Sequence, residues 1–205
     1  MKRKAEREAS SKKAEKKSAQ PCYYTVDGIV KRGLPVLSIT CVLGIGVGQI
    51  LNLKENSLLS MPALLILIPA LIKIGGDTGS MLGARLSSAF HMGLGEHLHK
   101  NPVVHNSLIA AAIVGFVSSG SVTVLVWIAS QLLGYGMPFL ILLKISLIAV
   151  CIELVVVHSA TIGIAFASHR FGIDPDDTVI PFIATLGDLV GVVGIFIALG
   201  LLDII

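Results

Sequence analysis

Apolar residues along the chain fall into five long runs separated by short polar stretches. The runs cover residues 34–53, 58–89, 108–133, 137–166 and 179–202. Each run is long enough to cross a hydrocarbon layer of about 30 Å at a helical rise of about 1.5 Å per residue. We therefore predict an all-α integral membrane protein with five transmembrane helices.

The second run carries polar and flexible residues in its middle. Lys73 and Asp77 stand among four glycines, at positions 75, 76, 79 and 83. Because glycine weakens helices and irregular backbone inside a membrane occurs only beside protein or water, we predict that this helix is broken and lines an internal path. An alternative is that Lys73 and Asp77, one helical turn apart, simply neutralise each other.

The fifth run contains a single ionisable residue, Asp188. At nine residues from the start of the run, its carboxylate lies roughly 14 Å deep, near the middle of the bilayer. Such an Asp costs about 2.5–3.5 kcal/mol to insert, so we expect it to face water, a partner or an ion. Ala184 and Gly191 share its helical face and leave room beside it, and Pro181 can free backbone carbonyl oxygens. These residues predict one wall of an ion path.

The fourth run holds three further ionisable residues, Lys144, Glu153 and His158. Glu153 and His158 are five positions apart and do not share a helical face well. Glu153 can attract cations, take part in proton coupling, or pair with Lys73, Lys144 or His158. The sequence leaves these roles open.

Composition agrees with the membrane class and shows where the charge lies. Hydrophobic residues make up 54% of the chain, and the mean hydropathy is +0.84. Ten of the 16 Lys and Arg residues fall within the first 33 positions. We divide the chain into a basic, disordered cytoplasmic tail (1–20), a juxtamembrane collar (21–33) and a transmembrane domain (34–205). The tail serves as a topology signal or contacts anionic lipid.

Cysteine and histidine usage does not predict a structural metal site. The three cysteines show no paired spacing. Four histidines and Glu96 lie between residues 91 and 105, and a wet interfacial loop is the default interpretation over a regulatory metal site. Basic residues are concentrated on one side if the N-terminus is cytoplasmic and the C-terminus is outside, so we predict that orientation.

Three strings carry a resemblance to a known family. They are Pro-Ala-Leu-Ile-Lys-Ile-Gly-Gly-Asp-Thr-Gly-Ser at 69–80, Gly-Ala-Arg-Leu-Ser-Ser-Ala at 83–89 and Asp-Pro-Asp-Asp-Thr-Val-Ile-Pro-Phe-Ile-Ala-Thr-Leu-Gly-Asp-Leu at 174–189. Over residues 34–205 the chain resembles the membrane part of the MgtE-type and solute carrier family 41 magnesium transporters. That family usually has Asn where Asp77 stands, so this chain carries an additional negative charge.

The resemblance implies Mg²⁺ or another divalent cation as the transported ion, without an organic cofactor, in a multi-pass protein of the plasma membrane. It also implies a homodimer, with a path lined by the second and fifth helices. Alternatives are an exchanger coupled to Na⁺ or H⁺ and, more remotely, an intramembrane enzyme, for which the spacing of Glu153 and His158 is wrong. The expected metal ligands are Asp188 and Asp77, and the expected lining residues are Ala184, Gly191, Pro181, Gly76 and Glu153. Asp174, Asp176 and Asp177 would concentrate cations at the mouth.

Overall fold

A computed structural model describes residues 26–93, 102–171 and 175–204, and every element within these ranges is helical. The elements are α2 (Val26–Leu53), α3 (Glu55–Leu59), α4 (Pro62–His91), α5 (Pro102–Leu132), α6 (Phe139–Arg170) and α7 (Pro175–Leu201). Five of them, all except α3, are long and apolar enough to cross a membrane. The prediction of an all-α protein with five membrane-spanning helices is confirmed at that level. The predictions for the tail (1–20) lie outside the described residues.

Proline and glycine residues set the helix boundaries. Helices α4, α5 and α7 begin at prolines and α6 follows one, consistent with a ring that fits the first helical turn. Between α5 and α6, Gly134 and Gly136 adopt φ values of 78° and 61°, which favour glycine. The Tyr135 N–H donates to the carbonyl of Ser130 at 2.9 Å and closes the end of α5. The Gly-Tyr-Gly segment therefore forms the short turn between two spans.

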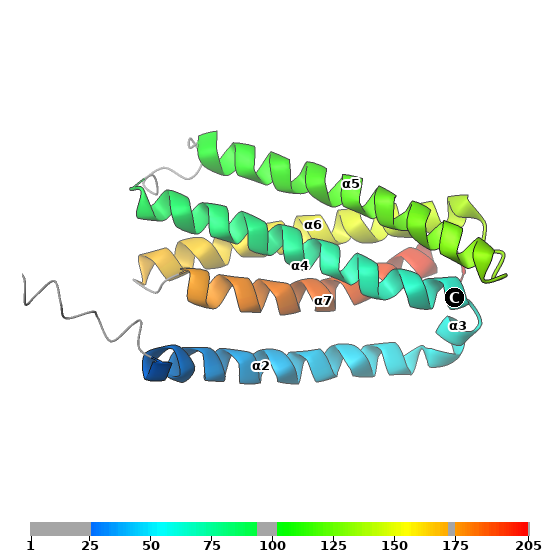
Figure 1. Ribbon diagram of the computed structural model, residues 1–205, viewed down its shortest axis with the longest axis horizontal. Helices are drawn as coiled ribbons and strands as arrows, with labels where there is room; N and C mark the ends of the chain where they lie inside the picture. The colour runs from blue at the N-terminus through cyan, green and yellow to red at the C-terminus, as the bar shows by residue number, and fades with distance from the viewer. Residues whose placement is uncertain (1–25, 94–101, 172–174, 205) are drawn as a thin grey trace, which may run out of the picture. The chain divides into compact units, whose positions relative to one another are not determined.

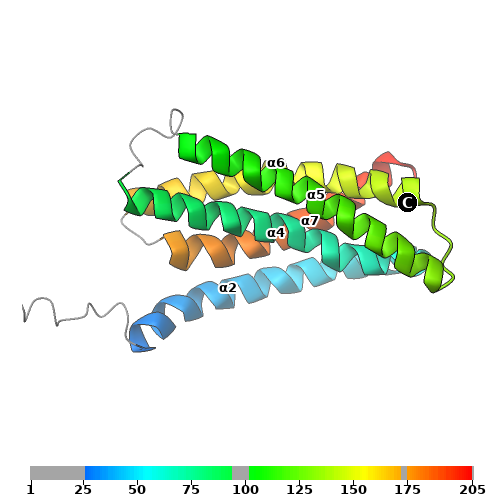
Figure 2. The same ribbon diagram turned by 45° about the horizontal axis from the view of Figure 1, so that its top comes forward.

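Residues 36–205 form one compact unit, in which helices α4, α5, α6 and α7 lie side by side. Helix α4 contacts the other three, and its most extensive contact is with α7 (Figure 1). Figure 2 shows the same four helices adjacent from a second direction. A buried hydroxyl pair joins α5 to α6, where Thr123 donates to Ser146 Oγ at 2.7 Å. Such bonds replace water for polar groups at membrane depth.

The prediction of a broken second helix is wrong. Helix α4 is continuous from Pro62 to His91, through Pro69 and all four glycines. The physical reason is that a helix satisfies its backbone groups internally, which matters more inside a membrane than the weak helix propensity of glycine. Three of these glycines face neighbouring side chains closely: an added Cβ would lie 2.6 Å from Val157 at Gly79 and 2.8 Å from Val179 at Gly83, and would overlap Glu153 at Gly75. The glycines serve helix packing instead of breaking the helix.

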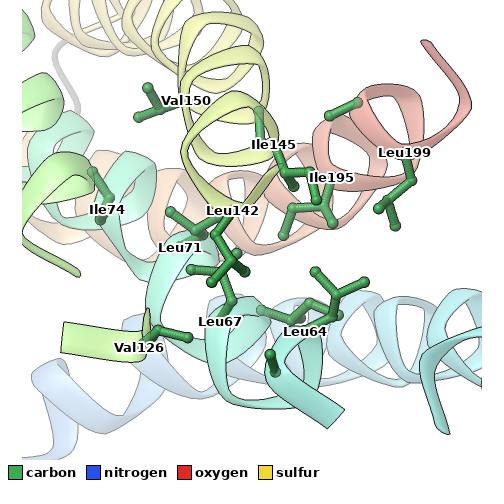
Figure 3. Close-up of a cluster of buried hydrophobic side chains, with 14 of the residues drawn as sticks. Leu64, Leu67, Leu71, Ile74, Val126, Leu142, Ile145, Val150, Ile195 and Leu199 are labelled. Carbon is green, nitrogen blue, oxygen red and sulfur yellow. The ribbon is translucent and has the colours of Figure 1, made fainter. Parts of the chain in front are cut away.

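Two apolar clusters occupy the two ends of this four-helix group. One joins the first half of α4 to the start of α6 and the end of α7, and Figure 3 shows its side chains, including Leu67, Leu142 and Ile195. The other joins the second half of α4 to the end of α6 and the start of α7, around Leu86 and Ile183. Between them lies a layer of glycines and polar groups at the middle of α4, α6 and α7. The candidate residues Gly76, Asp77, Glu153, Ala184, Asp188 and Gly191 lie in or next to this central layer, whereas Pro181 lies nearer the start of α7.

Candidate functional site at the crossing of α4 and α7

The backbones of α4 and α7 touch at a pair of buried glycines, Gly76 and Gly187. A Cβ on Gly187 would overlap the backbone nitrogen of Gly76, and one on Gly76 would lie 3.1 Å from the carbonyl oxygen of Ala184. The obstructing atoms belong to the backbone, so no side-chain rotation could make room. The two sequence motifs therefore meet at a contact that only glycine permits.

An ion pair spans the same two helices. Lys73 Nζ on α4 lies 2.9 Å from Oδ1 and 3.2 Å from Oδ2 of Asp188 on α7. The two side chains are 56% and 28% exposed, so the pair lies at the surface of the described helices and not in their core. Each residue is roughly 14–17 Å along its span, near the bilayer middle. Charges at this depth are costly against lipid, so we expect this face to meet water or protein.

Glu153 on α6 lies behind the crossing and is 1% exposed. Two glycines make room for it: a Cβ on Gly75 would overlap the carboxyl carbon, and one on Gly191 would lie 2.9 Å from Oε1. Oε1 has no hydrogen-bond partner among the described residues. An unsatisfied oxygen at full burial is uncommon and costs free energy, so packing alone does not account for Glu153.

His158 lies one to two turns further along α6 and joins α6 to α4. Its Nε2 is 3.3 Å from Thr78 Oγ1, while the Thr78 hydroxyl donates to the Ile74 carbonyl at 2.7 Å. Because the threonine hydrogen is used on Ile74, the histidine Nε2–H is the donor in this contact. His158 therefore has a structural partner and does not pair with Glu153.

The other predicted site residues lie around the ion pair. Asp77 is exposed, one turn from Lys73, and forms no ion pair with the residues that the structure describes. Pro181 stands inside α7, where its carbonyl accepts a hydrogen bond from Thr185 Oγ1 at 3.1 Å. A Cβ added to Gly191 would lie 2.8 Å from the Cα of Ile72. The space beside Gly191 is thus filled by Ile72 and Glu153, and Ala184 rests on Gly76.

The structure corrects the predicted pairings of the charged residues. Lys73 is bound by Asp188, so the alternative in which it neutralises Asp77 is wrong. None of the pairings considered for Glu153, with Lys73, Lys144 or His158, occurs in the described part of the chain. The Lys73–Asp188 pair was missed, although one signal was available: both charges stand at similar depth in their spans, where charges usually pair.

No group of three or more His, Cys, Asp or Glu side chains that could hold a metal ion occurs within the described residues. The histidine-rich loop lies largely outside them, since residues 94–101 are not described, so neither the expected wet loop nor the alternative of a regulatory metal site is tested. The side chains of Asp174, Asp176 and Asp177 are likewise outside the description. The carboxyl groups at the middle of the described helices are those of Asp188 with its bound ammonium, the exposed Asp77 and the buried Glu153.

Comparisons with known proteins find relatives over much of this chain. Solute carrier family 41 member 2 of Xenopus laevis is 26% identical over 177 residues, which cover 81% of this chain and 31% of that protein. The proteins of the same name from Gallus gallus and Homo sapiens are each 30% identical over 131 residues, covering 61% of this chain and 22% of theirs. The chain thus spans less than a third of the length of these relatives. No solved structure matches it significantly.

A family model described as MgtE, divalent cation transporter, matches residues 68–198, which is more than half of the chain. The match contains α5 and α6 whole and most of α4 and α7, and therefore the complete crossing with Lys73, Glu153 and Asp188. The chain belongs to the MgtE family of divalent cation transporters.

Proposed function

We propose that this chain carries divalent cations, Mg²⁺ foremost, across a membrane along the face formed by α4 and α7. Asp188 is the main binding carboxylate. The observation that carries this proposal is the position of Asp188: it lies at the middle of its span, partly exposed, and already holds a cationic group, the Lys73 ammonium. Membership of a divalent cation transporter family supports the same function and favours transport over an intramembrane enzyme.

The chemistry of the face suits Mg²⁺. This ion prefers oxygen ligands, gives up its water reluctantly and is usually held by one or two carboxylates through retained waters. The partial exposure of Asp188 leaves access for a hydrated ion. Asp77 is the second carboxylate on this face, and Glu153 lies behind it. The backbone carbonyls of Gly76 and Pro181 are secondary ligands.

A homodimer would complete the path. The exposed charges at mid-depth need water or protein opposite them. A twofold axis along this face would bring Asp188 of both copies to one site, so that one sequence position supplies two carboxylates. We further propose that the N-terminus is cytoplasmic, that the membrane is the plasma membrane and that the basic tail contacts anionic lipid.

A second mode, exchange of Mg²⁺ for protons, is favoured by Glu153. Its fully buried carboxyl group with an unpartnered Oε1 can hold a proton, and it adjoins Gly191, less than one turn from Asp188. Proton release there would add a negative charge behind the ion site. Exchange for Na⁺ remains the alternative taken from the sequence.

The test is Mg²⁺ uptake into proteoliposomes holding a Mg²⁺-sensitive dye, with and without pH and Na⁺ gradients. We expect uptake well above that of protein-free liposomes. If proton movement is coupled to Mg²⁺ uptake, an imposed pH gradient changes the uptake rate in wild type but not in Glu153→Gln. The matched control is Glu55→Gln, at an exposed position of α3, which should behave as wild type. The proposal fails if Mg²⁺ uptake stays at the level of protein-free liposomes under every pH and Na⁺ gradient tested.

A further inference from the structure

We propose that Lys73 is a tethered competitor of the transported ion. Its ammonium occupies Asp188 when no divalent cation is bound and moves to Asp77 when one arrives, which makes Lys73 a determinant of selectivity against monovalent cations. This inference rests on the proposed function, because it assumes that Asp188 binds the transported ion.

The contact geometry supports the first part. Nζ lies 2.9 and 3.2 Å from the two carboxylate oxygens, so one cation touches both atoms through which Asp188 would hold a metal ion. Any cation that binds Asp188 directly, or through its first water shell, must displace this ammonium. The Lys73 side chain is 56% exposed and has four rotatable bonds, so it is free to move away from Asp188.

Asp77 provides a place for the displaced ammonium. It is four residues beyond Lys73 on α4, a spacing that brings two helical side chains together. Its carboxylate is exposed and has no ion-pair partner among the described residues. Lys73, Asp77 and Asp188 together carry a net charge of −1 when no divalent ion is bound and +1 when one is bound. Neither state therefore concentrates much charge at this depth.

The same arrangement discriminates by charge. A monovalent cation replacing the ammonium at Asp188 exchanges one unit charge for another, and it competes with a covalently attached group that already touches both carboxylate oxygens. A divalent ion brings twice the charge to the carboxylate and gains about twice the Coulomb energy at equal distance. Because Lys73 lowers the apparent affinity of every cation for Asp188 by the same factor, it keeps weakly bound Na⁺ and K⁺ off the carboxylate, while the more strongly attracted Mg²⁺ still displaces it.

The first test measures inhibition of Mg²⁺ uptake by Na⁺ and K⁺ in proteoliposomes. At Mg²⁺ concentrations well below half-saturation, we expect the half-inhibiting concentration to fall about tenfold or more in Lys73→Met, which keeps the volume but removes the charge of the attached competitor. Lys73→Arg retains the charge and should stay near wild type. Equal half-inhibiting concentrations in wild type and Lys73→Met would overturn the proposal.

A chemical restoration gives a matched control on one protein. On a background lacking the three native cysteines, Lys73→Cys should show the same increased sensitivity to Na⁺. Reaction with 2-aminoethyl methanethiosulfonate attaches an ammonium at nearly the lysine length and should restore the wild-type inhibition. A neutral methanethiosulfonate of similar size should not; equal restoration by both reagents would contradict a role of the charge.

The movement itself can be followed in the full chain with Asp77→Asn, where the displaced ammonium finds no second carboxylate. An amine held in an ion pair reacts slowly with an acetylating ester, so in this variant Mg²⁺ should increase the acetylation of Lys73, read by mass spectrometry, severalfold. Lys54, which is exposed beside α3, is the internal control and should not change. Unchanged or reduced acetylation of Lys73 in Mg²⁺ would overturn the displacement.

Asp188→Asn separates the two proposals. If this variant transports like wild type, the proposed function fails and the inference falls with it. If it loses transport while Lys73→Met keeps wild-type selectivity, only the role of Lys73 is wrong. If it loses transport and Lys73→Met admits competition by Na⁺, both are supported.

Discussion

Three carboxylates near the middle of the bundle differ in their surroundings, and each difference has a consequence. Asp188 is held by an ammonium, Asp77 is exposed without an ion-pair partner in the described ranges, and Glu153 is buried with an unpartnered oxygen. Residue type alone would rank them equally as cation ligands. Their environments support the proposal that Asp188 is the primary site and that the other two have supporting roles.

For the residue Asp77, we expect Asp77→Asn to lower Mg²⁺ uptake less than Asp188→Asn does. The reason is that Asp77 has no ion-pair partner in the described ranges. The substitution also gives the residue type that the resemblance to the family predicts at this position. The measurement is initial uptake per inserted molecule at several Mg²⁺ concentrations. Complete loss in Asp77→Asn would make Asp77 a primary ligand and invert the ranking.

The residue pattern predicted Asp188 but not its partner. An isolated acidic residue in a 24-residue apolar run is visible in any single sequence, because its burial is costly wherever it points. The Lys73–Asp188 pair joins positions 115 residues apart and depends on how α4 rotates against α7. Local spacing offered Lys73 only Asp77, four positions away, and this pairing, considered as an alternative, is wrong.

At the scale of elements, glycines decide how closely the helices approach. Gly76 and Gly187 allow backbone contact, whereas Gly75 and Gly191 open the space that Glu153 fills. Hydropathy predicted the five spans, since length and apolar content are local properties. It could not distinguish glycines that break a helix from glycines that face another helix, so the prediction for the second span failed.

We expect Gly187→Ala to destabilise the protein by about 1–3 kcal/mol, because the added Cβ overlaps the Gly76 backbone and the helices must separate. Gly200→Ala on the same helix is the matched control, since no atom lies within 4 Å of its added Cβ. That control should be neutral or stabilising by up to about 1 kcal/mol. Thermal unfolding in detergent measures both, and a Gly187→Ala protein as stable as wild type would show that the crossing is looser than described.

For the whole molecule, the exposed charged face of α4 and α7 raises the question of what covers it. In a dimer, single cysteines at half-exposed positions of α7, such as Asp188 and Leu189, should crosslink between chains on a cysteine-free background. Cysteine at Val192, which is fully buried within its own chain, should not. If no single variant crosslinks, while Asp77→Cys combined with Asp188→Cys forms a disulfide within one chain, the path belongs to the monomer.

Removal of residues 2–20 should leave uptake per inserted molecule within a few-fold of wild type. The segment holds eight basic and three acidic residues, and none of the candidate ion-site residues belongs to it. Its positive charge favours cytoplasmic retention, so the fraction inserted correctly should fall. A truncated protein that inserts normally but does not transport would give the tail a part in the mechanism.

The most direct measurement is Mg²⁺ uptake by Asp188→Asn beside Asp203→Asn in proteoliposomes of equal protein content. Both variants remove one carboxylate, but Asp203 is exposed just beyond the end of α7, at a positive φ of 51° that Asn also tolerates. We expect uptake to fall to the protein-free level in Asp188→Asn, with elution as a single folded species, and to stay at the wild-type level in Asp203→Asn. Wild-type uptake by Asp188→Asn would contradict the assignment of the ion site to the crossing of α4 and α7.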